Sequence, residues 1–210
     1  MIDENGRLIE TFDEPGKKPS RRITCVATGV VVQEEWWWKH LGGYHRLDGP
    51  ASVRRKETGE LISERWFMNG DLHREDGPAV VEYGEYPGSY SEDWYRKGRW
   101  HRVGGPAMLI VVKGVPFMEH YYQDGFPHRL DGPAVITRHF DTKIVTTEGW
   151  HVWGLSYRTD GGPTSTIRHH ITGEIERQLF ESEETEPTRA EALRRRLNFM
   201  SRVIWVEPKP

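Results

Sequence analysis

The sequence predicts an all-β protein: an elongated open antiparallel β-meander of repeated hairpins, followed by a C-terminal α-helix. Three observations predict it. One motif returns at a nearly constant interval, and each copy contains a short hairpin turn. In addition, 9 Trp, 8 Tyr and 7 Phe supply much of the apolar surface, although hydrophobic residues make up only 36% of the chain. Such a composition suits a thin array of stacked units better than a thick aliphatic core.

The repeat is centred on the segment His-Arg-Glu-Asp-Gly-Pro-Ala at residues 73–79. Related segments begin at His45, His101, His128 and Tyr157, so successive copies are 28, 28, 27 and 29 residues apart. The third copy has Gly where the others have Asp, and the fifth contains an extra Gly. An aromatic residue stands seven positions before the first residue of each segment; these aromatics are Trp38, Trp66, Trp94, Tyr121 and Trp150.

Each copy contains the signals of two turns. Asn69-Gly70 and Asp124-Gly125 are favoured two-residue hairpin turns, because both positions can adopt positive φ. A second turn closes each unit near Gly59 and its equivalents. Gly before Pro favours extended backbone and Pro donates no ladder hydrogen bond, so the Asp-Gly-Pro segment predicts a kink or bulge. We therefore expect two long strands in each unit, with the second one bent.

The remaining segments complete the predicted domain organisation. Residues 1–21 are polar and predict a flexible N-terminal arm. Residues 22–180 predict the repeat array, in which five repeats and flanking half-units give about eleven strands. Residues 181–187 predict a linker, and residues 188–210 a capping or docking helix and tail. A capping box, Thr-Arg-Ala-Glu, opens this helix at Thr188.

The predicted helix carries a narrow apolar seam, which consists of Ala190, Leu193, Leu197, Met200 and Ile204. We expect the helix to cover the last repeat, because an open sheet leaves an edge strand that invites aggregation. Homodimerisation, or docking of a partner through the same seam, is the alternative.

Composition limits the compartment and the cofactors. The single Cys25 excludes an internal disulfide and a zinc site built on several cysteines, and it favours a reducing cytoplasm. No apolar stretch is long enough to predict a membrane span, and residues 1–5 do not resemble a signal peptide. The formal net charge of −3 disfavours nucleic acid as a partner. No sequence feature indicates a cofactor or a metal.

The repeated polar residues are expected to serve the architecture. Equivalent histidines of neighbouring units would lie roughly 9.5 Å apart, which is two strand spacings. That separation is too large for two of them to bind one zinc ion at ~2 Å each. Arg and Asp two positions apart on a strand share a face and can pair. We therefore expect structural roles for the repeat residues, among them Trp66, His73, Arg74, Asp76, Arg129 and Asp131.

The unit Trp-x-x-x-Gly-x-x-His resembles the MORN repeat, a hairpin with the core Trp-x-x-Gly-x-x-His-Gly. The fuller His-Arg-x-Asp-Gly-Pro-Ala form looks like an expanded variant seen in phage, giant-virus and bacterial proteins. The resemblance covers residues 36–180, but the unit here is longer and Arg follows His where MORN has Gly. MORN proteins are usually scaffolds that dimerise or contact membranes and partners, so the resemblance implies binding without specifying the ligand.

These features predict a non-catalytic scaffold for protein–protein interaction, and the resemblance suggests a phage-encoded one that acts on a host or virion protein in the host cytoplasm. No nucleophile elbow and no phosphate-binding Gly-rich loop is present. The alternative is a module for an anionic ligand (nucleotide, nucleic acid or lipid headgroup), because Arg102 has no Asp in its own repeat and is expected to be free. The candidate binding residues are Arg102, Trp100, Tyr44, Phe126, Trp153, Arg194, Arg195 and Arg196.

Overall fold

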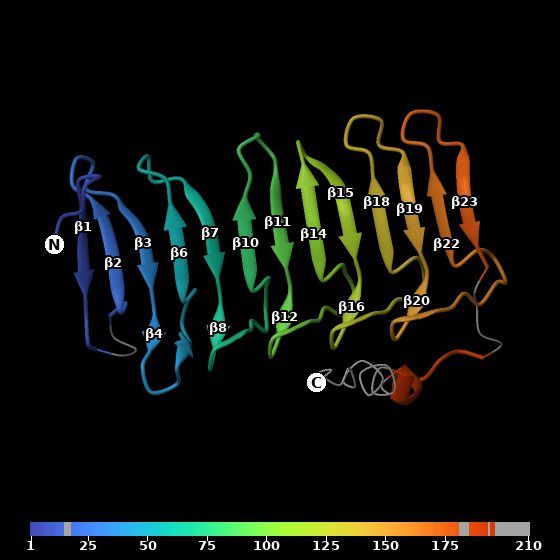
Figure 1. Ribbon diagram of the computed structural model, residues 1–210, viewed down its shortest axis with the longest axis horizontal. Coiled ribbons are helices and arrows are strands. Elements are labelled where there is room, and N and C mark those ends of the chain that lie inside the picture. The colour runs from blue at the N-terminus through green and yellow to red at the C-terminus, as the bar shows by residue number, and fades with distance from the viewer. Residues whose placement is uncertain (15–17, 181–184, 193, 196–210) are drawn as a thin grey trace, which may run out of the picture.

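The computed structural model describes residues 1–14, 18–180, 185–192 and 194–195. These residues form the predicted open antiparallel meander, with one short helix at the end (Figure 1). Thirteen strands make one sheet, in which the order in space is the order in the chain. They are β1 (Arg7–Thr11), β2 (Arg21–Cys25), β3 (Val31–Glu35), β6 (Ser52–Arg55), β7 (Leu61–Arg65), β10 (Val80–Tyr83), β11 (Tyr90–Asp93), β14 (Met108–Val112), β15 (Val115–His120), β18 (Val135–Arg138), β19 (Val145–Gly149), β22 (Ser165–Arg168) and β23 (Ile175–Leu179).

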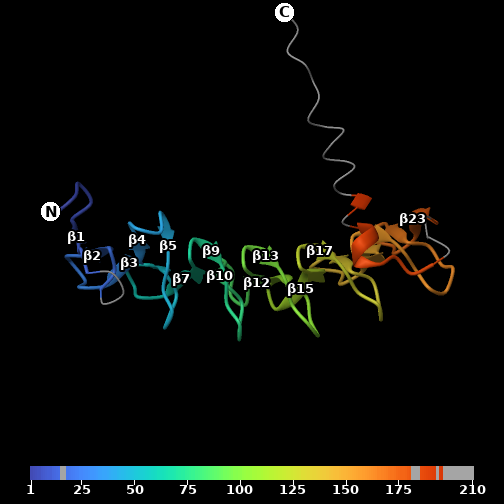
Figure 2. The same cartoon turned by 90° about the horizontal axis from the view of Figure 1, so that it is seen from below.

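Each repeat also forms a small two-stranded hairpin, and the five hairpins line the lower side of the main sheet in Figure 1. They are β4 (Trp37–Trp38) with β5 (Gly43–Tyr44), β8 (Phe67–Met68) with β9 (Asp71–Leu72), β12 (Tyr95–Arg96) with β13 (Arg99–Trp100), β16 (Tyr122–Gln123) with β17 (Phe126–Pro127), and β20 (His151–Val152) with β21 (Leu155–Ser156). Backbone hydrogen bonds join neighbouring hairpins; the Gly70 N–H, for example, donates to the Tyr44 carbonyl at 2.9 Å. The array is therefore a single elongated layer, as the view in Figure 2 shows.

The N-terminal segment belongs to the sheet, so the prediction of a flexible arm over residues 1–21 is wrong for the part that forms β1. This strand pairs with β2 along its whole length. Ile9 packs against a buried cluster of Ile23, Cys25 and Val32. Pairing and burial supplied by the rest of the fold thus order a segment whose own composition is polar. The sheet accordingly has thirteen strands rather than about eleven.

Both strands of each unit are interrupted, whereas the sequence predicts a bend in the second strand only. In the second repeat the bulge extends over residues 73–79, and Trp66 faces both of its ends. The His73 N–H donates to the Trp66 carbonyl at 3.0 Å, and the Trp66 N–H donates to the Ala79 carbonyl at 2.7 Å. Because one residue faces a whole loop, the outgoing strand also breaks there, between β7 and β8.

The hairpin tips adopt the predicted left-handed geometry. Asn69 and Gly70 have φ angles of 54° and 87°, and Asp124 and Gly125 have φ angles of 48° and 83°, as two-residue type I′ turns require. Trp153 occupies the same place in the fifth repeat with φ of 51°, a conformation that is uncommon for a bulky residue.

One face of the sheet, here called the arginine face, carries alternating large and small side chains. Ala79 lies between the Trp66 and Trp94 positions, because its carbonyl accepts the Trp66 N–H while its own N–H donates to the Asp93 carbonyl at 2.8 Å. The repeat alanines Ala51, Ala79, Ala107 and Ala134 are 0% exposed. In the first repeat this row contains Trp36, whose carbonyl accepts the His45 N–H at 3.0 Å. The assignment of Trp38 to the row is therefore wrong, because the first hairpin is two residues longer than the second.

Candidate binding surfaces

Each repeat arginine is held between an aromatic ring and a glycine backbone. The Arg74 Cζ lies 4.0 Å from the centroid of the Trp66 ring, and a Cβ added to Gly77 would lie 2.7 Å from the same carbon. Its Nε donates to Asp76 Oδ1 at 3.2 Å and its Nη1 to the Pro78 carbonyl at 3.4 Å. The stacking recurs in every repeat, at 3.8, 4.0, 3.9, 4.1 and 4.1 Å in chain order. One arrangement thus accounts for the Arg, the Gly and the Pro of the motif.

The predicted Arg–Asp pairs are present, but their carboxylates face solvent. Asp76 and Asp131 side chains are 87% and 84% exposed, whereas those of Arg74 and Arg129 are 25% and 23% exposed. Exposed ion pairs contribute little to stability. Ring stacking and the bond to the Pro carbonyl therefore hold the arginine more firmly than the Asp does.

The repeat histidines connect each hairpin to the next one. The Nδ1 of His73 accepts the backbone N–H of Lys97, the first turn residue of the following hairpin, at 3.1 Å. Three further bonds of this kind join His45 to Asn69 at 2.9 Å, His101 to Asp124 at 3.1 Å and His128 to Trp153 at 3.2 Å. In His45, His73 and His128, where Nδ1 accepts, the neutral ring carries its proton on Nε2, whereas the His101 Nδ1 also lies 3.0 Å from Asp124 Oδ1. This contact between repeats supports the expected structural role of the histidines.

Tyr157 replaces His in the fifth repeat, after which the described residues contain no further small hairpin. No turn N–H therefore needs a ring nitrogen at this position, and this accounts for the substitution. Among the residues that the structure describes, no group of three or more His, Cys, Asp or Glu side chains is placed to hold a metal ion.

A row of glutamates on the arginine face lies outside the sequence-based predictions. Its members stand two positions before the repeat aromatic and are Glu34, Glu64, Glu92, Glu119 and Glu148. The strand register places Glu64 between Val53 and Val81. Arg22 pairs with Glu34 at 3.0 Å, Arg168 pairs with Glu148 at 2.7 Å, and Arg138 pairs with Glu119. The signal is present in the sequence, because Glu-x-Trp or Glu-x-Tyr returns with the period of the repeat.

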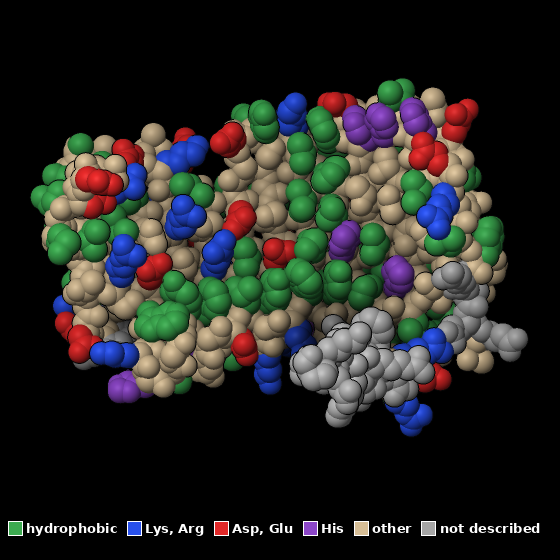
Figure 3. Space-filling view, in the orientation of Figure 1, with side chains coloured by type: hydrophobic (Ala, Val, Ile, Leu, Met, Phe, Trp, Pro, Cys, Tyr) green, Lys and Arg blue, Asp and Glu red, His purple; other side chains and the backbone are tan. Residues whose placement is uncertain are grey.

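The opposite face carries a continuous row of aromatic and apolar side chains, here called the aromatic stripe. It runs across the small hairpins as the green band in Figure 3. Ring centroids lie 5.1 Å apart for Trp37 and Tyr44, 5.1 Å for Tyr44 and Phe67, 5.4 Å for Tyr95 and Trp100, and 5.2 Å for Trp100 and Tyr122. Its members are Trp37, Tyr44, Phe67, Leu72, Tyr95, Trp100 and Tyr122. Two candidate binding residues, Tyr44 and Trp100, therefore lie in the stripe.

Several ionisable groups beside the stripe favour their neutral forms, although the ion pairs Arg21–Glu35 and Arg65–Glu82 lie on the same face. Burial raises the pKa of Tyr95 to about 12, and the charge of Asp93 adds to this shift. Burial likewise raises the pKa of Asp93, Tyr44 and Tyr122, and it lowers the pKa of His120. Shifts of this kind indicate poor hydration.

Phe126 and Trp153, the other two candidate aromatics, lie outside the stripe. Phe126 is 6% exposed, so its prediction as a surface contact is wrong. The next hairpin covers it, since a Cβ added to Gly154 would lie 3.3 Å from the Phe126 ring. Trp153 occupies a hairpin tip and stacks on His128 with ring centroids 4.1 Å apart. Its ring thus supports the contact between the fourth and fifth repeats.

The C-terminal helix begins with the predicted capping box. The Thr188 N–H donates to the Glu191 carboxylate at 2.6 Å, and the Glu191 N–H donates to the Thr188 hydroxyl at 3.2 Å. Residues 189–192 and 194–195 are its described helical residues. Of the candidate arginines, Arg194 and Arg195 are exposed. Arg196 and the seam residues Leu193, Leu197, Met200 and Ile204 lie outside the described residues.

The start of this helix contacts the small hairpins rather than the last strand. Arg189 Nη2 lies 3.0 Å from Asp124 Oδ2, and the Arg189 guanidinium lies 5.7 Å from the Trp153 ring centroid. In β23 and just after it, Ile175 and Phe180 are 56% and 65% exposed. The described part of the helix thus contacts the fourth and fifth hairpins, and among the described residues the expected cover of the exposed last strand is not seen.

Arg102 is engaged like the other repeat arginines, although its repeat has no Asp. Its Cζ lies 3.9 Å from the Trp94 ring centroid, and its Nη1 donates to the Pro106 carbonyl at 3.1 Å. The expectation that this side chain is free is therefore wrong, since the stack and the carbonyl bond fix it without a carboxylate.

Comparison with known proteins adds no identity to this geometry. No protein-family model matches the chain, and no curated protein matches it significantly. Within the described residues, no helix has the length and apolar character needed to span a bilayer. The inferences about function consequently depend on the two faces of the sheet.

Proposed function

We propose that this protein is a non-catalytic repeat scaffold that binds another protein along the aromatic stripe. The continuity of the stripe carries the proposal, because two runs of contacting rings, Trp37–Tyr44–Phe67 and Tyr95–Trp100–Tyr122, lie in one row with Leu72 between them. Aromatic side chains supply much of the energy at the centres of protein interfaces. The stacked arginines brace the sheet from the other face, so the stripe is preformed and its binding requires little ordering.

The dimensions of the stripe suit an elongated partner. It spans seven strands, which at ordinary strand spacing is roughly 30 Å. An amphipathic α-helix of about 20 residues has the same length and presents one apolar row. We therefore propose a helical apolar segment of a protein as the occupant.

The setting of the protein is part of the same proposal. A hairpin unit with a repeat aromatic, a turn glycine and a histidine supports kinship with MORN-like repeats. A phage-encoded scaffold acting on a host or virion protein in the host cytoplasm is the setting that this kinship implies. The free, buried Cys25 suits a reducing compartment. Homodimerisation through the C-terminal helix stays a separate prediction.

Affinity capture with matched variants tests this proposal. The double variant Tyr95→Ser and Trp100→Ser removes the centre of the stripe. The control variant Val103→Ser removes an apolar side chain that is 76% exposed in the bulge on the other face. A partner retained by the wild type and the control but lost by the double variant supports the proposal, provided that both variants unfold cooperatively. A partner that the double variant retains at wild-type level would refute it.

A further inference from the structure

The third repeat has an open place where four other repeats have a carboxylate. In those four, the arginine Nε lies 2.9, 3.2, 2.8 and 2.5 Å from an Asp oxygen two positions further along the chain. In the third repeat Gly104 takes that position with φ of 79°, which none of the four aspartates shares, and a Cβ added there would meet no atom within 4 Å. No carboxylate of the described residues replaces the missing one beside Arg102.

Arg102 is fixed as firmly as the arginines that do have an Asp. The Trp94 ring lies on one side of its guanidinium at 3.9 Å. On the other side, a Cβ added to Gly105 would lie 2.9 Å from the Arg102 Cζ. Nη1 is bound to the Pro106 carbonyl. The Nε–H therefore keeps the orientation that the other repeats use for a carboxylate, and such a preorganised donor loses little freedom on binding.

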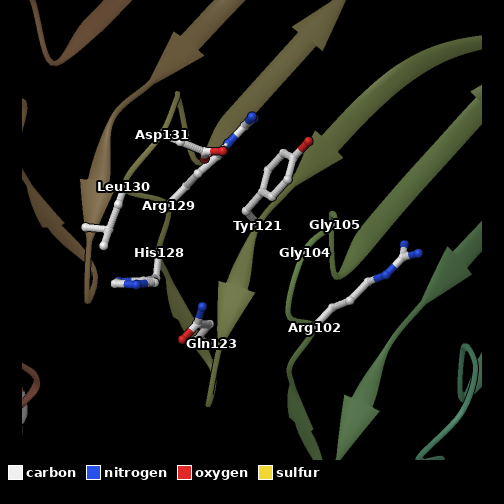
Figure 4. A pocket seen from close by; sticks show the side chains of 9 residues that line it. All are labelled: Arg102, Gly104, Gly105, Tyr121, Gln123, His128, Arg129, Leu130 and Asp131. Atoms are coloured by element: carbon white, nitrogen blue, oxygen red, sulfur yellow. Dashed lines mark hydrogen bonds and ion pairs between the residues drawn. The ribbon is translucent and has the colours of Figure 1, made fainter.

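The open place borders a hollow of about 310 Å³ between the third and fourth repeats, shown in Figure 4. Arg129 also lines the hollow, but its Nε is occupied by Asp131 at 2.8 Å. His128, whose Nδ1 accepts the Trp153 N–H, lies on the far wall of the hollow with its ring turned away from Arg102 (Figure 4). The other lining groups include Gln123 and Tyr121. Since the Asp131 carboxylate also lines the hollow, the donor open to an entering carboxylate is the Arg102 Nε–H.

We propose that Arg102 binds a carboxylate supplied from outside the chain, which completes the third repeat as Asp76 completes the second. The guanidinium of Arg matches the geometry of a carboxylate and forms short charge-assisted hydrogen bonds with it. The ligand is an acidic side chain of a bound polypeptide or a free dicarboxylate. This site lies on the arginine face, so it does not depend on binding at the aromatic stripe.

Nuclear magnetic resonance of the arginine Nε–Hε groups tests the site directly. The ¹⁵N-labelled full chain is titrated with succinate and, separately, with the peptide acetyl-Gly-Asp-Gly-Pro-Ala-amide. We expect a saturable shift of the Arg102 signal and no saturable shift of the Arg74 or Arg129 signals. The Gly104→Asp variant should weaken the Arg102 response at least tenfold, because the new carboxylate occupies the site. Gly104→Ala, which adds a side chain without an acceptor at the same positive φ, should retain the response.

The remaining outcomes are equally decisive. Saturation by the peptide at a concentration tenfold below that of succinate assigns the site to an acidic polypeptide, and the reverse order assigns it to a free dicarboxylate. Similar values support carboxylate binding itself. Absence of a saturable Arg102 shift up to about 100 mM of either probe, a range that covers the weak affinity of one ion pair, would overturn the proposal. Equal shifts at all repeat arginines would overturn it too, because they would indicate general screening.

Discussion

Replacement of Arg74 by Ala is expected to destabilise the sheet far more than replacement of Asp76 by Ala. The guanidinium lies 4.0 Å from the Trp66 ring centroid, and its side chain is 25% exposed, so its stacking contributes about 1–2 kcal/mol. The charge-assisted bond to the Pro78 carbonyl adds about 1.5 kcal/mol. We therefore expect the free energy of unfolding to fall by ~3 kcal/mol in Arg74→Ala. The Asp76 carboxylate is 87% exposed, and its removal should change that free energy within the error of measurement.

Urea unfolding followed by tryptophan fluorescence measures both variants in one assay. Arg74→Lys is the informative third variant, because it keeps the charge but loses the planar group that stacks and the Nε–H that bonds to Asp76. Its free energy of unfolding should lie close to that of Arg74→Ala. Equal losses in Arg74→Ala and Asp76→Ala would refute the reasoning, since the ion pair and not the stack would then hold the loop. Arg129 and Asp131 offer an independent repetition in the fourth repeat.

Four further predictions concern the array. Trp66→Ala should lower the free energy of unfolding by ~3–5 kcal/mol, because its half-buried ring packs against the Arg74 guanidinium in the second repeat; urea unfolding measures it, and a loss below ~1 kcal/mol would contradict that role. Ala79→Leu should destabilise by ~1–3 kcal/mol or more in the same assay, since Ala79 is 0% exposed. Deletion of residues 66–93, which joins Arg65 to Trp94, removes one period and should leave the circular dichroism spectrum of a β-sheet, with a lower melting temperature; loss of cooperative unfolding would contradict the matched register. Burial lowers the pKa of His128 in the folded chain, so the unfolded chain takes up a proton on this residue at a higher pH than the folded chain does. The free energy of unfolding should therefore be highest above the ordinary His pKa of about 6.5 and fall as the pH drops below it. His128→Asn keeps an acceptor without titrating, so the melting temperature of that variant should fall less between neutral and mildly acidic pH; an unchanged slope would contradict the bond to Trp153.

Features that depend on local chemistry could be predicted from the sequence. Asn69-Gly70 and Asp124-Gly125 indicate type I′ turns because few other dipeptides tolerate two positive φ angles. The motif period indicates an open meander because equivalent residues must pack at equivalent depth. The Arg-x-Asp spacing predicts a shared face, and the ion pairs are present.

Features set by distant parts of the chain could not be predicted in this way. The β1 strand is polar and depends on pairing with β2, so its composition resembles that of a flexible arm. The seven-residue spacing predicts Trp38 in the row of repeat aromatics on the arginine face. The first hairpin is two residues longer than the second, so Trp36 occupies that row instead. In the fourth hairpin Pro127, not Phe126, occupies the position equivalent to Leu72 and Trp100. Because neighbouring side chains on a strand point to opposite faces, the Phe126 ring points to the covered side. The stacking of Arg on Trp depends on the conformation of the bulge, which the amino-acid pattern of the motif alone does not specify.

The bonds from the repeat histidines to the following hairpin tips have a consequence for biosynthesis. They join residues only 24, 24, 23 and 25 positions apart in the chain. A nascent chain emerging from the ribosome can therefore dock each new unit on its finished predecessor without waiting for the C-terminus. Most β-sheet proteins must first close long loops, which slows their folding. Here we expect acquisition of structure to keep pace with translation, one period at a time.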